Sequence, residues 1–283
     1  MTGKQWLQKA KDEKFAIGAF NVANLETFKA IAQAAANKRS PVIIESSPGE
    51  TDWMGADNVV DIARNLAWDY NIPILVNLDH AEKLEECQKA IEQGYDLIHF
   101  DGSKLPLEEN LKILKQVVEL AHAKGLTAEG ELDHIGGSSE VHQGAPEMEI
   151  AKTDPEKAKT FVQESGIDIF AAFVGNVHGL YLGGTKNLDF DLVRRIAEAT
   201  GVFLSLHGSS GIPEDQVKQA IQYGIVKVNL NTEMRQGFKD TLEKVLKEHP
   251  EEYAMYKIEQ PIVDALRIIV EHKMEVFGSA GKA

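Results

Sequence analysis

Short apolar segments alternate with amphipathic segments along most of the chain. The apolar segments are rich in Val, Ile, Leu and Phe, as buried strands are, and each precedes a segment with helical spacing of apolar residues. The predicted strands cover residues 15–21, 41–47, 73–79, 96–102, 126–132, 168–175, 202–208 and 225–231. Helical spacing is clearest in residues 24–38, 56–70, 107–125 and 154–166. Eight strand-then-helix units predict an α/β fold, a (β/α)₈ TIM barrel, with a doubly wound open sheet as the alternative.

Two segments fall outside this alternation. Residues 133–152 form a long glycine-containing loop, and such a loop often covers an active site. The C-terminal tail, from about Lys247 to Ala283, has helical spacing and is expected to pack on the barrel or on a second subunit. No Pro/Gly/Ser-rich linker divides the chain, so residues 1–283 are predicted to form one domain.

Charge and cysteine content narrow the function classes. The 283 residues include 30 basic and 44 acidic side chains, and the net charge of −14 disfavours nucleic acid and anionic membranes as partners. A phosphorylated small molecule stays compatible with this charge, because backbone amides and helix N-termini bind phosphate locally. The single cysteine, Cys87, cannot form an intrachain disulfide, and no apolar run reaches the length of a membrane span. We therefore expect a cytoplasmic protein.

Histidines follow three of the predicted strands. In a TIM barrel the active site lies at the C-terminal ends of the strands, and His80, His178 and His207 stand at the ends of predicted strands three, six and seven. The other histidines are not expected to converge there, among them His99 within predicted strand four and His134 in the long loop. Three histidines with acids nearby predict a zinc site with an open position. The alternative is three independent histidines that bond to the backbone.

Acidic and amide side chains occupy the same strand ends. Asp79 directly precedes His80, Asp101 ends strand four, and Glu129 and Glu131 end strand five. Strand eight ends in "NLNTEMR", which carries Asn229, Asn231 and Thr232. Since these ends meet at one mouth of a barrel, the acids, amides and histidines are predicted to face one another. Taken alone, the Asp79–His80 pair is also compatible with a helix cap.

The segment "HGSSGIPEDQVKQAI", residues 207–221, resembles an anion site. Its Gly/Ser loop runs into a helix and can present amide protons and hydroxyls to an anion. The loops after strands seven and eight are the usual phosphate site of TIM barrels. The alternative is ordinary helix capping after a tight turn, but the position beside His207 favours phosphate.

Lys227 allows a second type of chemistry. It lies two residues before Asn229 on predicted strand eight, so both side chains share the inward face. An inward lysine can form a Schiff base with a carbonyl substrate. The alternative is a lysine paired with a carboxylate inside the barrel, and this reading is favoured because lysine is rarely buried unpaired.

Motifs along nearly the whole chain support a family resemblance. They are "AFNVANLET", "LDH", "FDGS", "AEGEL", "TDPEKAKTFV", "GNVHGLY", "LHGSSGIP", "KVNLNTEMR" and "FGSAGKA". Each motif is weak alone, but their order and spacing are specific. The chain resembles the class II, zinc-dependent ketose-bisphosphate aldolases, which include fructose-1,6-bisphosphate and tagatose-1,6-bisphosphate aldolases.

The resemblance implies a role for each site residue. It implies Zn²⁺ bound by His80, His178 and His207, a monovalent cation as activator, and Asp79 as the acid/base for the C4 hydroxyl. Asp101 and Glu131 match positions near the metal and are assigned to the metal site, as an alternative metal position. The residues placed around the substrate are Asn21, Ser47, Gly179, Gly208, Ser209, Ser210, Asn229, Asn231 and Thr232.

The sequence departs from the family pattern at several positions. Ser139 stands where members carry a proton-shuttling glutamate in the long loop, so either the adjacent Glu140 takes that role or the shuttle is weakened. Leu182 stands where some members have a basic residue that contacts phosphate, and Lys186 is the candidate substitute. Ser209 replaces a glycine that is frequent in the fructose enzymes. These departures affect substrate preference and rate rather than the metal chemistry.

The predicted function is reversible cleavage of a ketose 1,6-bisphosphate, with the fructose compound first, to dihydroxyacetone phosphate and glyceraldehyde 3-phosphate. The alternatives are a tagatose-bisphosphate or keto-acid phosphate aldolase and a non-catalytic sugar-phosphate-binding barrel. The predicted partner is a small sugar phosphate, without nucleic acid or membrane, and the resemblance implies a homodimer or homotetramer.

Overall fold

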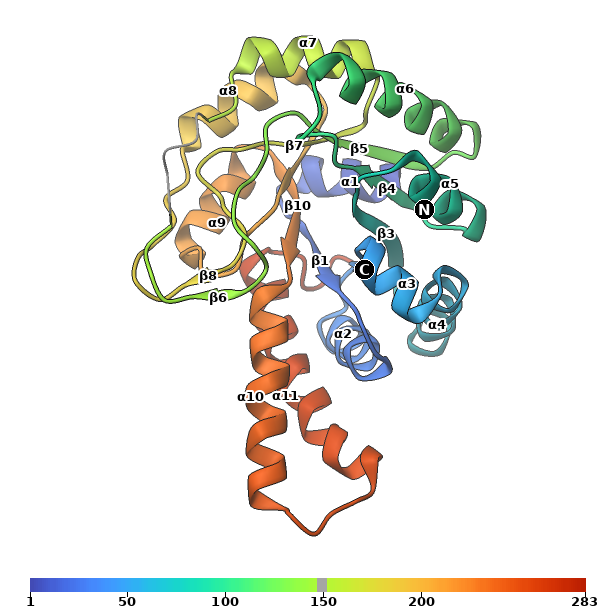
Figure 1. The fold of residues 1–283 in the computed structure, drawn as a ribbon, viewed down its shortest axis with the longest axis vertical. Helices are drawn as coiled ribbons and strands as arrows, with labels where there is room; N and C mark the ends of the chain where they lie inside the picture. The colour runs from blue at the N-terminus through green and yellow to red at the C-terminus, as the bar shows by residue number, and fades with distance from the viewer. Residues whose placement is uncertain (147–151) are drawn as a thin grey trace.

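The chain forms a closed barrel of eight parallel strands (Figure 1). The structure is a computed structural model, and it describes residues 1–146 and 152–283. The barrel strands are β1 (Ile17–Asn21), β2 (Val42–Ser46), β3 (Ile74–Ala81), β4 (Leu97–Phe100), β5 (Thr127–Glu131), β7 (Ile169–Ala171), β9 (Phe203–Leu206) and β10 (Ile225–Leu230). The barrel closes where β1 pairs with β10, with Ile17 opposite Lys227. This closure confirms the predicted TIM barrel and excludes the open sheet.

Apart from the first helix, which precedes β1, the helices follow the strands and cover the outside of the barrel. They are α1 (Gly3–Glu13), α2 (Leu25–Lys38), α3 (Pro48–Met54), α4 (Ala56–Tyr70), α5 (Leu84–Gln93), α6 (Leu107–Ala123), α7 (Pro155–Ser165), α8 (Phe190–Thr200), α9 (Glu214–Gln222), α10 (Thr232–Glu248) and α11 (Met255–Val276). The four helices expected from apolar spacing are α2, α4, α6 and α7. The start of α7 shows the local cause, because the Asp154 carboxylate accepts the N–H groups of Glu156 and Lys157. None of the described helices combines the length and apolar character that a membrane span requires.

The inside of the barrel is apolar at the N-terminal ends of the strands. Helix α1 contributes Trp6 and Leu7 to a buried cluster with Ile43, Leu75 and Leu97, which come from neighbouring strands. This cluster closes the lower end of the barrel. Polar and charged side chains are therefore left for the upper layers, toward the C-terminal strand ends.

The sixth barrel strand is shorter than predicted. The sequence predicts a strand over residues 168–175, but β7 ends at Ala171. Beyond it, side chains replace the ladder partners, since Thr153 Oγ1 accepts the Phe173 N–H and Asn176 Oδ1 accepts the Val174 N–H. The backbone leaves the sheet here and carries the "GNVHGLY" segment toward the barrel mouth.

The long loop after β5 is anchored on the segment after β7. Its residues Val141–His142 form β6, which pairs in parallel with β8 (Leu180–Tyr181). The His142 ring also stacks on Tyr181, with ring centroids 4.5 Å apart. This loop therefore lies at the same mouth as His178, as a covering loop would require.

The C-terminal tail packs on the barrel and also extends beyond it. Helix α11 packs along α2 and α10, and the Ala283 N–H donates to the Arg39 carbonyl at the end of α2. The far parts of α10 and α11 form an arm that projects from the barrel (Figure 1). The predicted tail began near Lys247, whereas α10 already starts at Thr232.

Candidate functional site

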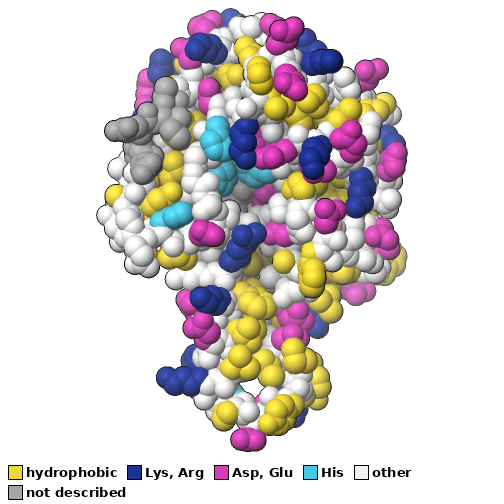
Figure 2. Space-filling model, in the orientation of Figure 1, with side chains coloured by type: hydrophobic (Ala, Val, Ile, Leu, Met, Phe, Trp, Pro, Cys, Tyr) yellow, Lys and Arg dark blue, Asp and Glu magenta, His cyan; other side chains and the backbone are white. Residues whose placement is uncertain are grey.

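A cavity of about 220 Å³ opens at the C-terminal mouth of the barrel. Figure 2 shows histidine side chains within a hollow at the middle of this face. Most of the residues predicted to form the site line this cavity: Asn21, Asp79, His80, Asp101, His178, Gly179, His207, Gly208, Ser209, Ser210, Asn229, Asn231 and Thr232. Residues more than two hundred positions apart in sequence thus share one space, as the barrel topology requires.

A local irregularity in β3 turns Asp79 and His80 into the same cavity. Consecutive strand residues normally point to opposite faces, but the pairing of β3 with β4 shifts register between Leu78 and Ala81. His80 there has a φ of 52°, a left-handed value that is uncommon for a residue other than glycine. The bulge redirects its side chain, which allows the carboxylate and the imidazole to act together.

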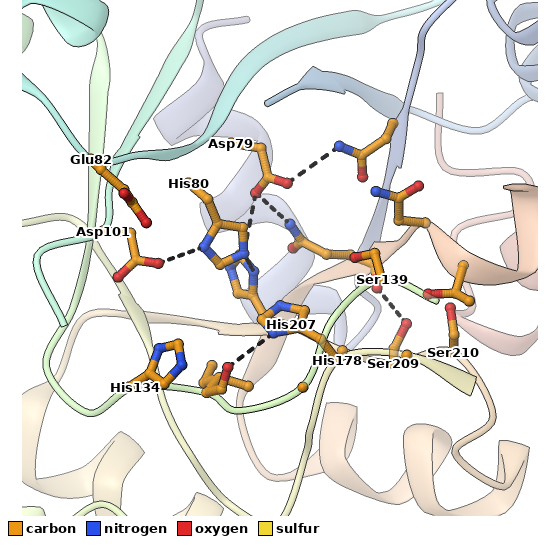
Figure 3. Close-up of a pocket in the computed structure, with 18 of the residues that line it drawn as sticks. Asp79, His80, Glu82, Asp101, His134, Ser139, His178, His207, Ser209 and Ser210 are labelled. Atoms are coloured by element: carbon orange, nitrogen blue, oxygen red, sulfur yellow. Dashed lines mark hydrogen bonds and ion pairs between the residues drawn. The ribbon is translucent and has the colours of Figure 1, made fainter. Parts of the chain in front are cut away.

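The three predicted histidines gather next to Asp79 (Figure 3). The ring centroid of His80 lies 4.6 Å from that of His207 and 5.0 Å from that of His178. The distance between the rings of His178 and His207 is 6.2 Å. The prediction that these residues converge is confirmed, and the reading as three separate backbone-bonded histidines is wrong.

Each of these imidazoles has one ring nitrogen held by an acceptor. His80 Nδ1 lies 2.9 Å from Asp101 Oδ2, His207 Nε2 lies 2.8 Å from Glu129 Oε1, and His178 Nδ1 donates to the Ile135 carbonyl at 3.1 Å. The second nitrogens of His80 and His207 lie 3.0 Å from each other, and all three histidines line the cavity. This arrangement fixes ring orientation and tautomer in metal sites.

Burial and neighbouring charges separate the three histidines electrostatically. Burial disfavours the imidazolium of His80, but the carboxylates of Asp79 and Asp101 outweigh it and raise the pKa of His80 to about 10. Burial, together with the charge on His80, lowers the pKa of His178 to about 3. Burial likewise lowers the pKa of His207 to about 4. The site therefore favours one positive charge at its centre, where a metal ion can replace the His80 proton.

Two further histidines lie here against expectation. The ring of His99 is fully buried and lies 4.7 Å from that of His80, and His134 lines the cavity. The expectation that neither converges on the mouth is wrong. The reason is that β4 points His99 inward beneath His80, where its Nδ1 accepts the His80 backbone N–H at 3.2 Å. Since that nitrogen is engaged, His99 supports the position of His80.

Asp79 is buried among donors. Its carboxylate accepts from Asn21 Nδ2 at 3.3 Å and from Asn229 Nδ2 at 3.2 Å, and it lies 3.9 Å from His80 Nε2. Burial alone would raise the pKa of this carboxyl, but His80 and His99 hold it well below its usual range. Asp79 is therefore ionised at neutral pH and faces the cavity as a proton acceptor.

Lys227 is paired with carboxylates inside the barrel. Its Nζ lies 2.7 Å from Glu129 and 3.8 Å from Glu45, and all three side chains are fully buried. Burial opposes the ammonium, but these carboxylates raise the pKa of Lys227 above its usual value. A lysine held in this charged state is a poor nucleophile, so the geometry favours the ion-paired reading over the Schiff base.

The two acids assigned to the metal site lie behind the histidines. Asp101, His80 and Glu131 form a group whose ligand atoms lie within 4.8 Å of one another. Asp101 already bonds His80, and Glu131 Oε1 accepts the Ile135 N–H at 3.1 Å. Burial and the charge on Asp101 raise the pKa of Glu131 to about 8. This geometry supports an orienting role for both acids: Asp101 orients His80, and Glu131 orients the backbone at Ile135.

Besides Glu131, two predicted site residues lie outside the lining of the cavity. Glu140 is exposed, and its carboxylate accepts from Ser138 Oγ at 3.2 Å, whereas its neighbour Ser139 does line the cavity. Ser47 caps the start of α3 and bonds the carboxylate of Glu50. Their roles stay predictions.

Arg235 is a residue that the sequence reasoning missed. It follows β10 in the "NTEMR" motif, and its Nη2 lies 2.8 Å from Glu50 Oε1. It lines a second cavity of about 200 Å³ that shares Asn21 and Asn231 with the first. The signal was present, because the arginine stands five residues after the end of β10, in the first turn of α10, and the strand ends form the mouth.

The chain matches one family over almost its full length. The family model described as "Fructose-bisphosphate aldolase class-II" matches residues 1–282. With the closed barrel and the histidine cluster already established, the chain belongs to the class II fructose-bisphosphate aldolase family. It is an aldolase, a lyase that acts on a carbon–carbon bond, and this family is zinc-dependent in general.

Individual relatives carry more specific names. The fructose-bisphosphate aldolase of Geobacillus stearothermophilus is 40% identical over 99% of this chain and 97% of its own length. The D-tagatose-1,6-bisphosphate aldolase subunit GatY of Klebsiella oxytoca is 36% identical over 100% of this chain and 99% of its own. Among solved structures, the YdjI aldolase from Escherichia coli K12 is similar, with a TM-score of 0.85, 30% identity, and coverage of 99% of this chain and 98% of that one.

Proposed function

We propose that this aldolase reversibly cleaves fructose 1,6-bisphosphate to dihydroxyacetone phosphate and glyceraldehyde 3-phosphate. The observation that carries the proposal is the convergence of three imidazoles that line the cavity, each oriented by an acceptor on one ring nitrogen, beside an ionised Asp79. The relative named as a fructose-bisphosphate aldolase at 40% identity supports this substrate over others.

We propose that His80, His178 and His207 hold the zinc ion. The cavity-facing nitrogens of His80 and His207 lie 3.0 Å apart, and tetrahedral zinc with Zn–N bonds of about 2.0–2.1 Å separates two nitrogen ligands by about 3.3 Å. Three histidines also leave a fourth position for substrate, as catalytic zinc sites do. When bound, zinc supplies Lewis-acid polarisation of the substrate ketone oxygen.

Asp79 is the acid/base in this proposal. Its carboxylate faces the cavity, is held by two amides, and is kept ionised by the neighbouring histidines. It accepts the proton of the C4 hydroxyl during cleavage and returns it during condensation. Asn21 and Asn229 fix the orientation of the carboxylate, so the proton moves along a set direction.

The loops after β9 and β10 are proposed to bind the phosphate of the dihydroxyacetone half. Gly208, Ser209 and Ser210 line one side of the cavity, and Asn231 and Thr232 start α10 on the other. The N-terminus of α10 offers a positive dipole end to the phosphate, and its Glu233 N–H donates to Ser210 Oγ, which ties the two loops together. Gly179 lines the same part of the cavity and contributes backbone without a side chain.

The second phosphate is proposed to bind toward Arg235. Asn21 belongs to both cavities and joins the histidine centre to the arginine side, where Ser47 and Glu50 also lie. Arg235 is about half exposed in its side chain and so can reach a ligand. A guanidinium binds phosphate through paired, charge-assisted hydrogen bonds.

Substrate identity is tested by a coupled assay of triose-phosphate release. We expect zinc-loaded protein to cleave fructose 1,6-bisphosphate faster than tagatose 1,6-bisphosphate, to lose activity with a chelator and to regain it with added zinc. Faster cleavage of tagatose 1,6-bisphosphate would identify a tagatose-bisphosphate aldolase, as the Klebsiella relative is named. Cleavage only of a deoxy-keto-acid phosphate would identify a keto-acid phosphate aldolase. Sugar-phosphate binding without turnover would identify a non-catalytic barrel. Full activity of metal-free protein would rule out the zinc proposal.

We also propose that the protein forms a homodimer or homotetramer. Figure 2 shows hydrophobic side chains over the projecting arm of α10 and α11. On this arm Leu246, Tyr253, Met255 and Tyr256 are all exposed, and exposed apolar surface of this kind commonly marks an interface. Light scattering during gel filtration measures the mass directly.

The single domain over residues 1–283 and the cytoplasmic location stay predictions.

A further inference from the structure

Lys186 is buried beneath the loops that line the cavity, and it has an unusual set of partners. Only 1% of the residue is exposed. Its Nζ donates to the backbone carbonyls of Gly179, Gly208 and Ser210, at 2.5, 2.8 and 2.5 Å. Among the described residues, no carboxylate lies within ion-pair distance of it. Buried lysines usually pair with an acid, so these three carbonyls need an explanation.

The three carbonyls come from the two segments that frame the cavity. Gly179 and Gly208 directly follow the histidines His178 and His207, and Ser210 belongs to the Gly/Ser loop. Gly208 has a φ of 59°, and a Cβ there would lie 2.4 Å from the Val177 carbonyl oxygen. The backbone can therefore turn its carbonyls toward Lys186 only because no side chain is present at this position.

A cage of backbone carbonyls is a site for a monovalent cation. Potassium channels strip the hydration shell of K⁺ with carbonyl oxygens alone. An ammonium group carries one positive charge and three N–H donors, which match the three carbonyls here. A neutral amine has one donor fewer and would turn a lone pair toward an oxygen. The Tyr181 ring, whose centroid lies 5.6 Å from Nζ, adds a face that favours a cation.

The charge of Lys186 is tied to its surroundings. Burial lowers the pKa of this lysine to about 7, while Glu233 at the start of α10 acts in the opposite direction. A phosphate dianion in the adjacent loop would favour the charged form further, because an opposite charge nearby stabilises it. The lysine thus stands where a free cation would otherwise be needed.

We propose that Lys186 is a built-in monovalent cation that joins the two segments framing the cavity and makes a free K⁺ or Na⁺ unnecessary. The activating cation implied by the family resemblance is then supplied by the chain itself. Lys186 is a positioning residue, because it does not contact the substrate itself. It holds the Gly179 and Gly208 backbone, which lines the substrate cavity. Its effect on turnover rests on the proposed function, but its effect on cation binding does not.

The test compares wild-type protein with Lys186→Ala in choline chloride, with added KCl, NH₄Cl or tetramethylammonium chloride at constant ionic strength. The first readout is thermal unfolding of zinc-loaded protein, and the second is kcat/KM for fructose 1,6-bisphosphate. We expect wild type to respond equally to all four salts. We expect the variant to lose on the order of 10²-fold in kcat/KM through misplacement of the loops. Saturable recovery of both readouts by NH₄⁺ or K⁺, without recovery by tetramethylammonium, would support the proposal.

Controls separate this proposal from a loss of fold and from the proposed function. Lys89→Ala removes an exposed lysine of α5 and should behave as wild type. A saturable K⁺ requirement of wild type, which needs no variant, would overturn the proposal. So would a folded Lys186→Ala protein, or Lys186→Met protein, that neither loses activity nor gains a cation response. Cation-specific stabilisation of the variant without turnover of any substrate would uphold the Lys186 site and reject the proposed function.

Discussion

His80 Nε2 lies 3.0 Å from His207 Nδ1, although the two residues are 127 positions apart in the chain. The outer nitrogen of each ring is already held, by Asp101 and by Glu129. Two neutral rings held in this way would turn lone pairs toward each other, so the contact requires a shared proton or a metal ion. The geometry is that of two ligands prepared for the same cation.

Removal of one of the three proposed histidine ligands should abolish zinc binding. In His207→Ala or His178→Ala, two histidines remain, and catalytic zinc sites characteristically use three protein ligands. We expect zinc content, measured by atomic absorption after dialysis, to fall close to zero and aldolase turnover to fall with it. His249→Ala, in an exposed turn beyond α10, is the control and should keep both. A His178→Ala protein that retains stoichiometric zinc would remove this residue from the site.

Asp79→Asn should separate proton transfer from metal binding. The amide keeps the size of the carboxylate but cannot accept the C4 hydroxyl proton, so kcat should fall by about 10²–10⁴. Zinc content should stay that of wild type, because the three imidazoles are unchanged. The control is Asp61→Asn on the exposed face of α4. An unchanged kcat would assign the proton transfer to another residue.

Glu129 and Lys227 should behave as one energetic unit. Their charges are fully buried and lie 2.7 Å apart, so Glu129→Gln or Lys227→Met alone leaves a buried charge without its main partner. We expect each single variant to lower the free energy of unfolding in urea by about 3–5 kcal/mol. The double variant should cost clearly less than the two losses added.

The same pair also tests the Schiff-base alternative. Borohydride reduction with substrate present should leave wild-type activity unchanged, because Lys227 is held as an ammonium. Covalent trapping of substrate on Lys227, detected by mass spectrometry, would favour the alternative mechanism.

Arg235→Ala should weaken binding of the bisphosphate. A lost charge-assisted hydrogen bond costs about 1.5–3 kcal/mol, so KM for fructose 1,6-bisphosphate should rise by roughly 10- to 150-fold. Lys104→Ala is the matched comparison, because Lys104 is a cation on the other side of the mouth, paired with Glu82. A large effect at Lys104 and none at Arg235 would place the second phosphate at the opposite side.

Asp168 should make stability depend on pH. Its carboxylate accepts from Lys4 at 2.8 Å, from His122 at 2.7 Å and from the Ala128 N–H at 3.0 Å. Burial raises the pKa of Asp168, but these donors outweigh burial and hold it below its usual value. Because the folded pKa is depressed, this stabilisation is present above the unfolded value of about 3.9 and is lost as pH falls below it.

The variant that tests this is Asp168→Asn. We expect it to lower the free energy of unfolding at pH 7 by about 1–3 kcal/mol. The difference from wild type should shrink below about pH 4, where the wild-type carboxyl also becomes protonated. Thermal unfolding across this pH range measures both effects. A difference that does not change with pH would show that packing, rather than charge, is lost.

Local pattern was sufficient for the barrel and for much of its site. Alternating apolar segments set the strands and helices, because side-chain direction repeats every two residues in a strand and about every 3.6 in a helix. Once a barrel was inferred, every strand end belonged to one mouth, so His80, His178 and His207 could be grouped without coordinates. The same reasoning placed Lys227 on the inward face of its strand but did not identify the carboxylate that pairs with it.

The tertiary structure decided what the periodicities do not encode. Asp79 and His80 share the cavity although they are consecutive residues of β3, because a bulge and a left-handed φ at His80 redirect its side chain. Lys186 has a loop position typical of an exposed lysine, and the carbonyl cage forms only when the segments that contain Gly179 and Gly208 fold around it. Sequence pattern determines which face a residue takes within its own element. Contacts between distant loops depend on barrel closure and local backbone shape, so they exist only in the assembled fold.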